Sequence, residues 1–224
     1  MNSSKEWVSI KFDAPFLTNN TLTSEMDALW FVFHGYGQLA EHFIRRFDVL
    51  DSSTNHVVAL QGLSKFYLDN NYKKVGASWM TKLEREVDIL HQKRYIDEVF
   101  YNRLMKADKK EMKLNFFAFS QGGATLLRWL KDAQPKVDNL IMWAADLPSE
   151  LTVTDFNFLS EESNLVVVLG NQDPFAKMID ITRQKELLQN LPCSTEFVSF
   201  DGGHLVKRDV LETIIEKLNC KTNF

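Results

Sequence analysis

The chain has 224 residues, of which 45% are hydrophobic and 25% charged, and its formal net charge is -4 at pH 7. This composition is typical of a globular protein, and we expect one domain over residues 1–224. A weakly acidic chain without a basic patch argues against nucleic acid as a partner. No apolar run approaches the ~20 residues that cross a bilayer, and the first residues lack a secretory signal, so we expect a cytoplasmic protein without a membrane span.

Residues 7–22 alternate apolar and polar side chains around Val8, Ile10 and Phe12, which predicts an antiparallel hairpin at a sheet edge. Apolar runs and helix-patterned stretches then alternate along the chain. The expected strands are 29–33, 56–60, 115–119, 140–143, 165–169 and 195–200, and the expected helices are 39–47, 80–106, 124–133, 177–190 and 205–218. Wholly apolar strands that alternate with helices indicate an α/β fold, with a mostly parallel sheet and helices on both faces.

Ser120 follows the strand at 115–119 and precedes a helix. A serine at such a tight turn projects its hydroxyl from the sheet edge, and the turn requires small residues two before and two after it. Ala118 and Gly122 occupy these positions, so the pattern departs from G-x-S-x-G by one methyl group. The alternative is a serine that only caps a helix. The context favours a nucleophile.

Asp173 and His204 each follow a later strand, and loops after strand ends carry the catalytic groups of such folds. A carboxylate there can fix the tautomer of a histidine, which then acts as general base. Taken singly, Asp173 could be a turn residue before proline and His204 an idle residue at a helix entry. Together with Ser120 they appear in the chain order of an α/β-hydrolase triad.

The run His34-Gly35-Tyr36-Gly37-Gln38 follows the strand at 29–33, where this type of fold places an oxyanion loop. We assign the two donors to the backbone amides of Tyr36 and Gln121, and we expect His34 to brace the loop. Phosphate binding is the weaker interpretation, because the chain lacks both a Walker lysine and the G-x-G-x-x-G spacing.

The motifs HGYGQ, FSQGGA, GNQDP and GGH together resemble the phospholipase/carboxylesterase family, which includes acyl-protein thioesterases, and residues 61–80 resemble its bacterial esterase-like branch. The resemblance covers most of the chain from Trp30 onward. It implies an α/β-hydrolase without a large cap domain that cleaves carboxylic esters or thioesters without a cofactor. Departures occur at Ala118, at Gln38 in place of an acid, and at Ala144-Ala145, where the family has a Ser-Gly pair.

The substrate is expected to be an ester or thioester with a small to medium acyl group. The expected acyl pocket consists of five apolar side chains, Tyr36, Phe66, Trp79, Leu147 and Phe175, although such residues could simply cover the sheet edge. A catalytically silent binding protein or a serine peptidase on the same scaffold are the competing functions. We expect no metal site and reduced thiols at Cys193 and Cys220, while the sequence leaves a disulfide and a homodimer open.

Overall fold

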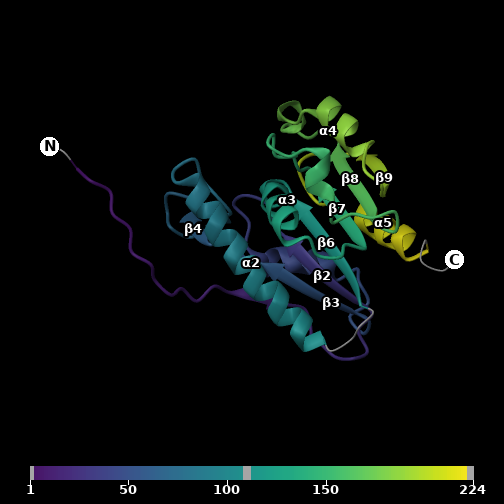
Figure 1. Ribbon diagram of the computed structural model, residues 1–224, viewed down its shortest axis with the longest axis horizontal. Coiled ribbons are helices and arrows are strands. Elements are labelled where there is room, and N and C mark those ends of the chain that lie inside the picture. The colour runs from purple at the N-terminus through teal and green to yellow at the C-terminus, as the bar shows by residue number, and fades with distance from the viewer. Residues whose placement is uncertain (1–2, 108–111, 221–224) are drawn as a thin grey trace.

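The structure is a computed structural model that describes residues 3–107 and 112–220. Its centre is a seven-stranded sheet in the order β1-β3-β2-β6-β7-β8-β9, parallel except for β1 (Figure 1). The strands of this sheet are β1 (Phe16–Thr18), β2 (Ala28–Phe33), β3 (Asn55–Leu60), β6 (Lys113–Phe119), β7 (Asn139–Trp143), β8 (Asn164–Gly170) and β9 (Ser194–Phe200). The expected mostly parallel sheet is confirmed.

Helices cover both faces of this sheet because its central strands are apolar on both sides. The helices are α1 (Ala40–Phe43), α2 (Arg85–Ala107), α3 (Gln121–Ala133), α4 (Ile181–Leu188) and α5 (Arg208–Cys220), with 3-10 turns η1 (Ile44–Phe47), η2 (Val153–Phe156) and η3 (Ala176–Met178). One core cluster joins the sheet to α2, α3 and α4. The other joins its opposite face to α1 and α5. Burial on both faces explains why these strands carry no polar alternation.

The expected antiparallel edge is present, but its form differs from a hairpin. Only Phe16–Thr18 forms a strand within residues 7–22, and it pairs with β3 in the register Phe16↔Leu60. Residues 3–15 precede it without regular structure. Alternation in the sequence marks a chain suited to pairing, but it does not supply the neighbouring strand.

The segment between β3 and α2 also differs from the expected loop. It contains an antiparallel hairpin of β4 (Ser64–Tyr67) and β5 (Val75–Ser78) outside the main sheet. Backbone bonds tie it to the loop after β2, where Gly37 donates to the carbonyl of Ala77 at 2.8 Å and Ala77 donates to Gln38 at 3.2 Å. The hairpin therefore fixes the position of a loop at the carboxyl edge of the sheet.

A row of asparagines crosses three central strands at their amino-terminal ends. Asn115, Asn139 and Asn164 are register partners on β6, β7 and β8. The amide of Asn139 donates to Asn115 Oδ1 at 2.7 Å, and the amide of Asn164 donates to Asn139 Oδ1 at 3.0 Å. Since slipping the register by one residue would separate these buried groups, the row favours one alignment of the strands.

We expect Asn139→Ala to lower the free energy of unfolding by about 2–4 kcal/mol, because it leaves the buried carbonyl of Asn115 without its donor and removes the acceptor of Asn164. Urea unfolding followed by circular dichroism would measure this loss. Asn71→Ala, at an exposed position in the hairpin, is the control and should change stability little. Equal stability of both variants would contradict a role of the row in alignment.

Candidate active site

Ser120 lies on a sharp turn between β6 and α3, with φ 52° and ψ -121°. A non-glycine residue with positive φ is strained, so the surrounding structure must hold it. The turn packs against the end of β2: a Cβ on Gly122 would lie 2.6 Å from the carbonyl oxygen of His34. Ala118, where the usual pattern has glycine, is fully buried between Phe33 and Met142 as register partners, so its methyl group is accommodated in the core.

The loops after β6, β8 and β9 bring Ser120, Asp173 and His204 together. His204 Nε2 lies 3.0 Å from Ser120 Oγ, and His204 Nδ1 lies 2.7 Å from Asp173 Oδ2. The Asp173 side chain has no exposed surface, and its Oδ1 accepts the backbone N–H of Phe175 at 2.8 Å. Both carboxylate oxygens therefore have partners, which fixes the carboxylate plane facing the imidazole.

Two aromatic rings hold the imidazole of His204. Its centroid lies 4.8 Å from the ring of Phe119 and 4.7 Å from the ring of Phe175, the latter edge-on. Phe119 is buried and Phe175 is half exposed, so one ring supports the imidazole from the core and the other covers it toward solvent. Phe119 is not among the site residues predicted from the sequence, although an aromatic residue immediately before the candidate serine is a usable signal.

His34 braces the loop after β2, as expected. Its Nδ1 bonds the carbonyl of Gly35 at 2.8 Å, and its Nε2 accepts the N–H of Gly62 at 3.0 Å. This pattern fits a neutral ring with its proton on Nδ1. Burial lowers the pKa of His34 to about 4, and the bond to Gly35 opposes that shift only in part. The ring therefore stays neutral near pH 7 and links the loop to the end of β3.

Gln38 has a structural role in the site that its sequence motif did not predict. Its side-chain oxygen accepts the N–H of Gly35 at 2.9 Å, within the same loop. An amide can accept this bond without carrying the charge of the acid found in the family motif. Gln38 thus closes the loop on itself through the amide of Gly35.

The amides expected to form the oxyanion hole belong to Tyr36 and Gln121. Within the described part of the chain, neither N–H has a hydrogen-bond partner. The Gln121 side chain is fully engaged: its oxygen accepts the N–H of Trp79 at 3.1 Å, and its nitrogen donates to the carbonyl of Met80 at 2.9 Å. This side chain anchors the turn at Ser120 to the two residues that follow β5, Trp79 and Met80.

The five residues expected to line an acyl pocket separate into two groups. The rings of Tyr36 and Phe66 pack together at a tilt of 31°, with centroids 5.1 Å apart; Tyr36 is 60% exposed, and Phe175 is half exposed beside His204. Trp79 and Leu147 are buried instead, at 0% and 3% exposure. The indole of Trp79 packs on the ring of His34 and donates to the His34 carbonyl oxygen at 2.8 Å. Trp79 and Leu147 therefore offer a substrate no surface in this conformation.

The described residues contain no group of three or more His, Cys, Asp or Glu side chains arranged to hold a metal ion. Cys193 is buried and Cys220 is exposed, and both are free thiols. Across residues 3–107 and 112–220, no helix combines the length and apolar character required to cross a membrane.

No protein-family model and no curated protein matches the sequence. Solved structures do match. A phospholipase/carboxylesterase from Dyadobacter fermentans has a TM-score of 0.66 at 17% identity, over 94% of this chain and 99% of that one. A Bacillus cereus carboxylesterase gives 0.68 at 15% identity, over 92% and 94%. Zea mays acyl-protein thioesterase 2 gives 0.66 at 13% identity, over 93% and 99%.

The chain therefore has an α/β-hydrolase fold, and the segments after β6, β8 and β9 carry the contacting side chains of Ser120, Asp173 and His204. Within that class its structure is similar to phospholipase/carboxylesterase and acyl-protein thioesterase structures over almost its whole length. The expected resemblance is confirmed at the level of the fold, and the identities of 13–17% carry it no further.

We expect acid to destabilise the protein through its two buried histidines. Burial, and for His56 also the nearby Arg103, lowers each pKa to about 4 in the folded state, against 6.5 when unfolded. Between these values the unfolded chain binds more protons, so stability falls as pH falls. His34 alone should account for a loss of about 2 kcal/mol between pH 7 and pH 5.

Denaturant unfolding of His34→Gln at both pH values would test this. The variant should lose about 2 kcal/mol less than the wild type over the interval, whatever its absolute stability. His42→Gln is the matched control, because the His42 side chain is 65% exposed. An unchanged pH dependence in His34→Gln would show that His34 is not the titrating group.

Proposed function

We propose that this protein is a serine hydrolase of carboxylic esters or thioesters, with Ser120 as nucleophile, His204 as general base and Asp173 as the orienting acid. The observation that carries the proposal is the continuous chain of contacts from Ser120 Oγ to His204 at 3.0 Å and from His204 to Asp173 at 2.7 Å. Structural similarity to carboxylesterases and a thioesterase supports the same reaction class.

In the first half of the reaction, His204 Nε2 removes the proton of the Ser120 hydroxyl as Oγ attacks the acyl carbon. Asp173 accepts the Nδ1–H, which keeps Nε2 unprotonated before attack and stabilises the imidazolium afterwards. The imidazolium then gives its proton to the departing alcohol or thiol. The product is an acyl-Ser120 ester, which water activated by His204 hydrolyses to release the acid.

The backbone amides of Tyr36 and Gln121 would bind the oxyanion of each tetrahedral intermediate. Both lack an intramolecular acceptor in the described residues, and both stand on segments fixed by buried side-chain bonds. Donors held in place before the reaction need not reorganise as charge develops, which is the source of their catalytic effect. The position of Gly122 against His34 sets the separation of the two segments.

The acyl group would rest on the paired rings of Tyr36 and Phe66, next to the proposed oxyanion loop. Phe175 forms the opposite rim above His204. Since Trp79 and Leu147 are buried, the proposed pocket is shallow and favours small to medium acyl groups. A silent binding protein remains the competing function, and the peptidase has no observation in its favour.

We expect Ser120→Ala to lower kcat/KM for p-nitrophenyl esters by about 10⁴-fold or more, because the nucleophile is removed. Hydrolysis of p-nitrophenyl esters of graded chain length, followed by absorbance, would measure the change. Ser52→Ala is a matched control in an exposed loop at the opposite edge of the sheet and should retain activity. Equal turnover by Ser120→Ala would refute the triad, and a wild type inert on every ester would favour the silent scaffold.

We expect Phe66→Ala to lower kcat/KM for octanoyl esters by about tenfold while acetyl esters change little, because only the longer chain reaches the paired rings of Tyr36 and Phe66. The control is Tyr67→Ala on the next position of β4, where the ring packs against Tyr72 at 5.0 Å instead. An equal loss on both esters would mean that Phe66 supports the hairpin and does not contact the acyl chain.

A further inference from the structure

Residues 3–15 form an N-terminal arm that precedes the edge strand β1 and runs away from the body of the protein (Figure 1). Its apolar side chains are unusually exposed: Trp7 64%, Val8 84%, Ile10 78% and Phe12 62%. Scattered single apolar residues are normal on a surface, but four within six positions form a contiguous patch. Such a patch indicates a surface that another molecule covers.

The backbone of the arm is also unpaired. No bond joins the backbone of residues 3–14 to other backbone groups of the described chain. The arm leads into β1, which stands at the outer edge of the sheet with its free side exposed. A drawn-out segment with unpaired N–H and C=O groups and alternating apolar side chains is suited to pairing with another strand.

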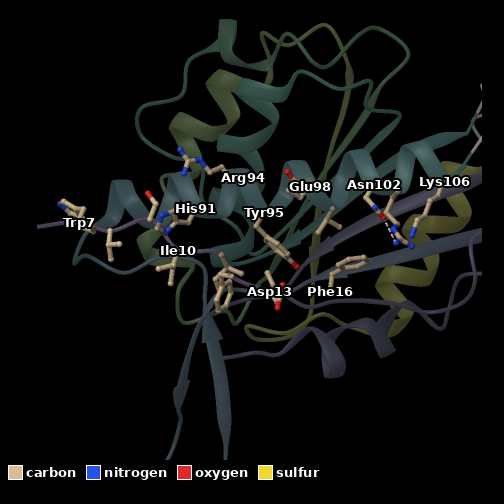
Figure 2. Close-up of a pocket in the computed structure, with 17 residues that line it drawn as sticks. Trp7, Ile10, Asp13, Phe16, His91, Arg94, Tyr95, Glu98, Asn102 and Lys106 are labelled. Atoms are coloured by element: carbon tan, nitrogen blue, oxygen red, sulfur yellow. Dashed lines mark hydrogen bonds between the residues drawn. The ribbon is translucent and has the colours of Figure 1, made fainter.

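A groove of about 1000 Å³ lies between the arm and α2. Figure 2 shows Trp7 and Ile10 of the arm near His91 and Arg94 of the helix. Arg103 lines the same groove over the ring of Phe16, at 4.9 Å. Its Nε is buried without a hydrogen-bond partner among the described residues. The groove therefore combines a largely apolar wall, formed by the arm, with a mostly polar wall on α2 that includes a donor without an acceptor, which a polypeptide could supply.

We propose that the arm is a dimerisation element: the arms of two copies pair antiparallel about a two-fold axis, and each fills the groove of the other. In an antiparallel pair related by a two-fold axis, equivalent residues of the two strands point to the same face of the pair. Because directly opposite residues also share a face, an odd-numbered residue must lie opposite an odd-numbered one, and an even-numbered residue opposite an even-numbered one. Only registers centred on a residue satisfy this condition.

The charges of the arm select one of these registers. Centred on Ser9, the pairing places Lys5 opposite the partner's Asp13 and, on the other face, Val8 opposite the partner's Ile10. Opposite charges and apolar pairs across strands are both stabilising. A centre on Val8 would oppose Lys5 to the partner's Lys11, and a centre on Ile10 would place Asp13 against the partner's Trp7. The Ser9 register also places Glu6 opposite the partner's Phe12, but of these three registers it alone forms an opposite-charge pair and it avoids the like-charge pair.

The arm is held where this pairing requires it. The hydroxyl of Tyr95 on α2 donates to the carbonyl of Pro15 at 2.8 Å, which fixes the base of the arm beside the groove. Nearer its start, Lys5 contacts Glu84 in the same chain. An ammonium group has three donors, so Lys5 can keep Glu84 and also contact the partner's Asp13.

Sedimentation velocity on the full chain, across micromolar concentrations, tests the proposal. We expect a dimer for the wild type, and we expect Ile10→Asp to raise the dissociation constant by about 100-fold because each dimer then contains two carboxylates among apolar side chains. Thermal unfolding of this variant followed by circular dichroism should match the wild type at protein concentrations where both are monomeric. Phe197→Asp, at an exposed position on the opposite edge strand β9, is the matched control.

Two outcomes overturn the proposal. One is a wild type that stays monomeric throughout the range. The other is a dimer that survives Ile10→Asp. If in addition the dimer is lost only in Phe197→Asp, the interface lies at β9 and not at the arm. Neither result bears on ester hydrolysis, so this proposal and the proposed function fail independently.

Cysteine cross-linking tests the register in a Cys220→Ser background, since Cys193 is buried. Opposite residues in an antiparallel pair are about 5 Å apart at Cα, within reach of a disulfide, so Ser9→Cys should form a covalent dimer under mild oxidation. Val8→Cys is offset by two residues from its own copy, about 8 Å away, and should not. Efficient cross-linking by Val8→Cys but not Ser9→Cys would refute the register.

Discussion

The close approach of the turn at Ser120 to the end of β2 is the contact on which the site depends. Gly122 lies so near the carbonyl of His34 that any side chain there would collide with it. This approach holds Ser120 at a positive φ that its own chemistry disfavours. It also brings the amide of Gln121 into the neighbourhood of the loop that carries Tyr36. One backbone contact thus positions both the Ser120 side chain and the loop facing it.

Buried neutral polar groups make this contact durable. His34 bridges the loop after β2 and the end of β3 as an uncharged ring, and the side chain of Gln121 joins the turn at Ser120 to Trp79. Bonds of this kind cost little while every partner is present and much when one is lost. The parts of the site therefore support one another across four separate segments. The β4–β5 hairpin is joined to them by the backbone bridge between Ala77 and Gln38.

The carboxyl ends of the strands and the outer edge at β1 differ in how their polar groups are paired. At the carboxyl ends of the strands, loops converge on Ser120, His204 and Asp173. At the β1 side, the arm leaves the sheet with its backbone unpaired and its apolar side chains exposed. A proposed hydrolytic centre and a proposed pairing surface thus lie on separate elements, so that association through the arm leaves access to Ser120 unchanged.

The sequence alone determined the order of the six parallel strands and of the five helices in the described residues, because apolar runs and glycine-marked turns are local signals, but it did not show the β4–β5 hairpin. Ser120, Asp173 and His204 were predictable for the same reason: each lies just beyond the carboxyl end of a predicted strand, and parallel strands end at one edge. Tertiary structure decided the rest. Three features depend on which distant segment lies alongside: the burial of Trp79 in the core, the loop-closing bond of Gln38 and the unpaired backbone of the arm. Neighbouring residues in the sequence do not show which distant segments will meet, so local patterns could not predict these features.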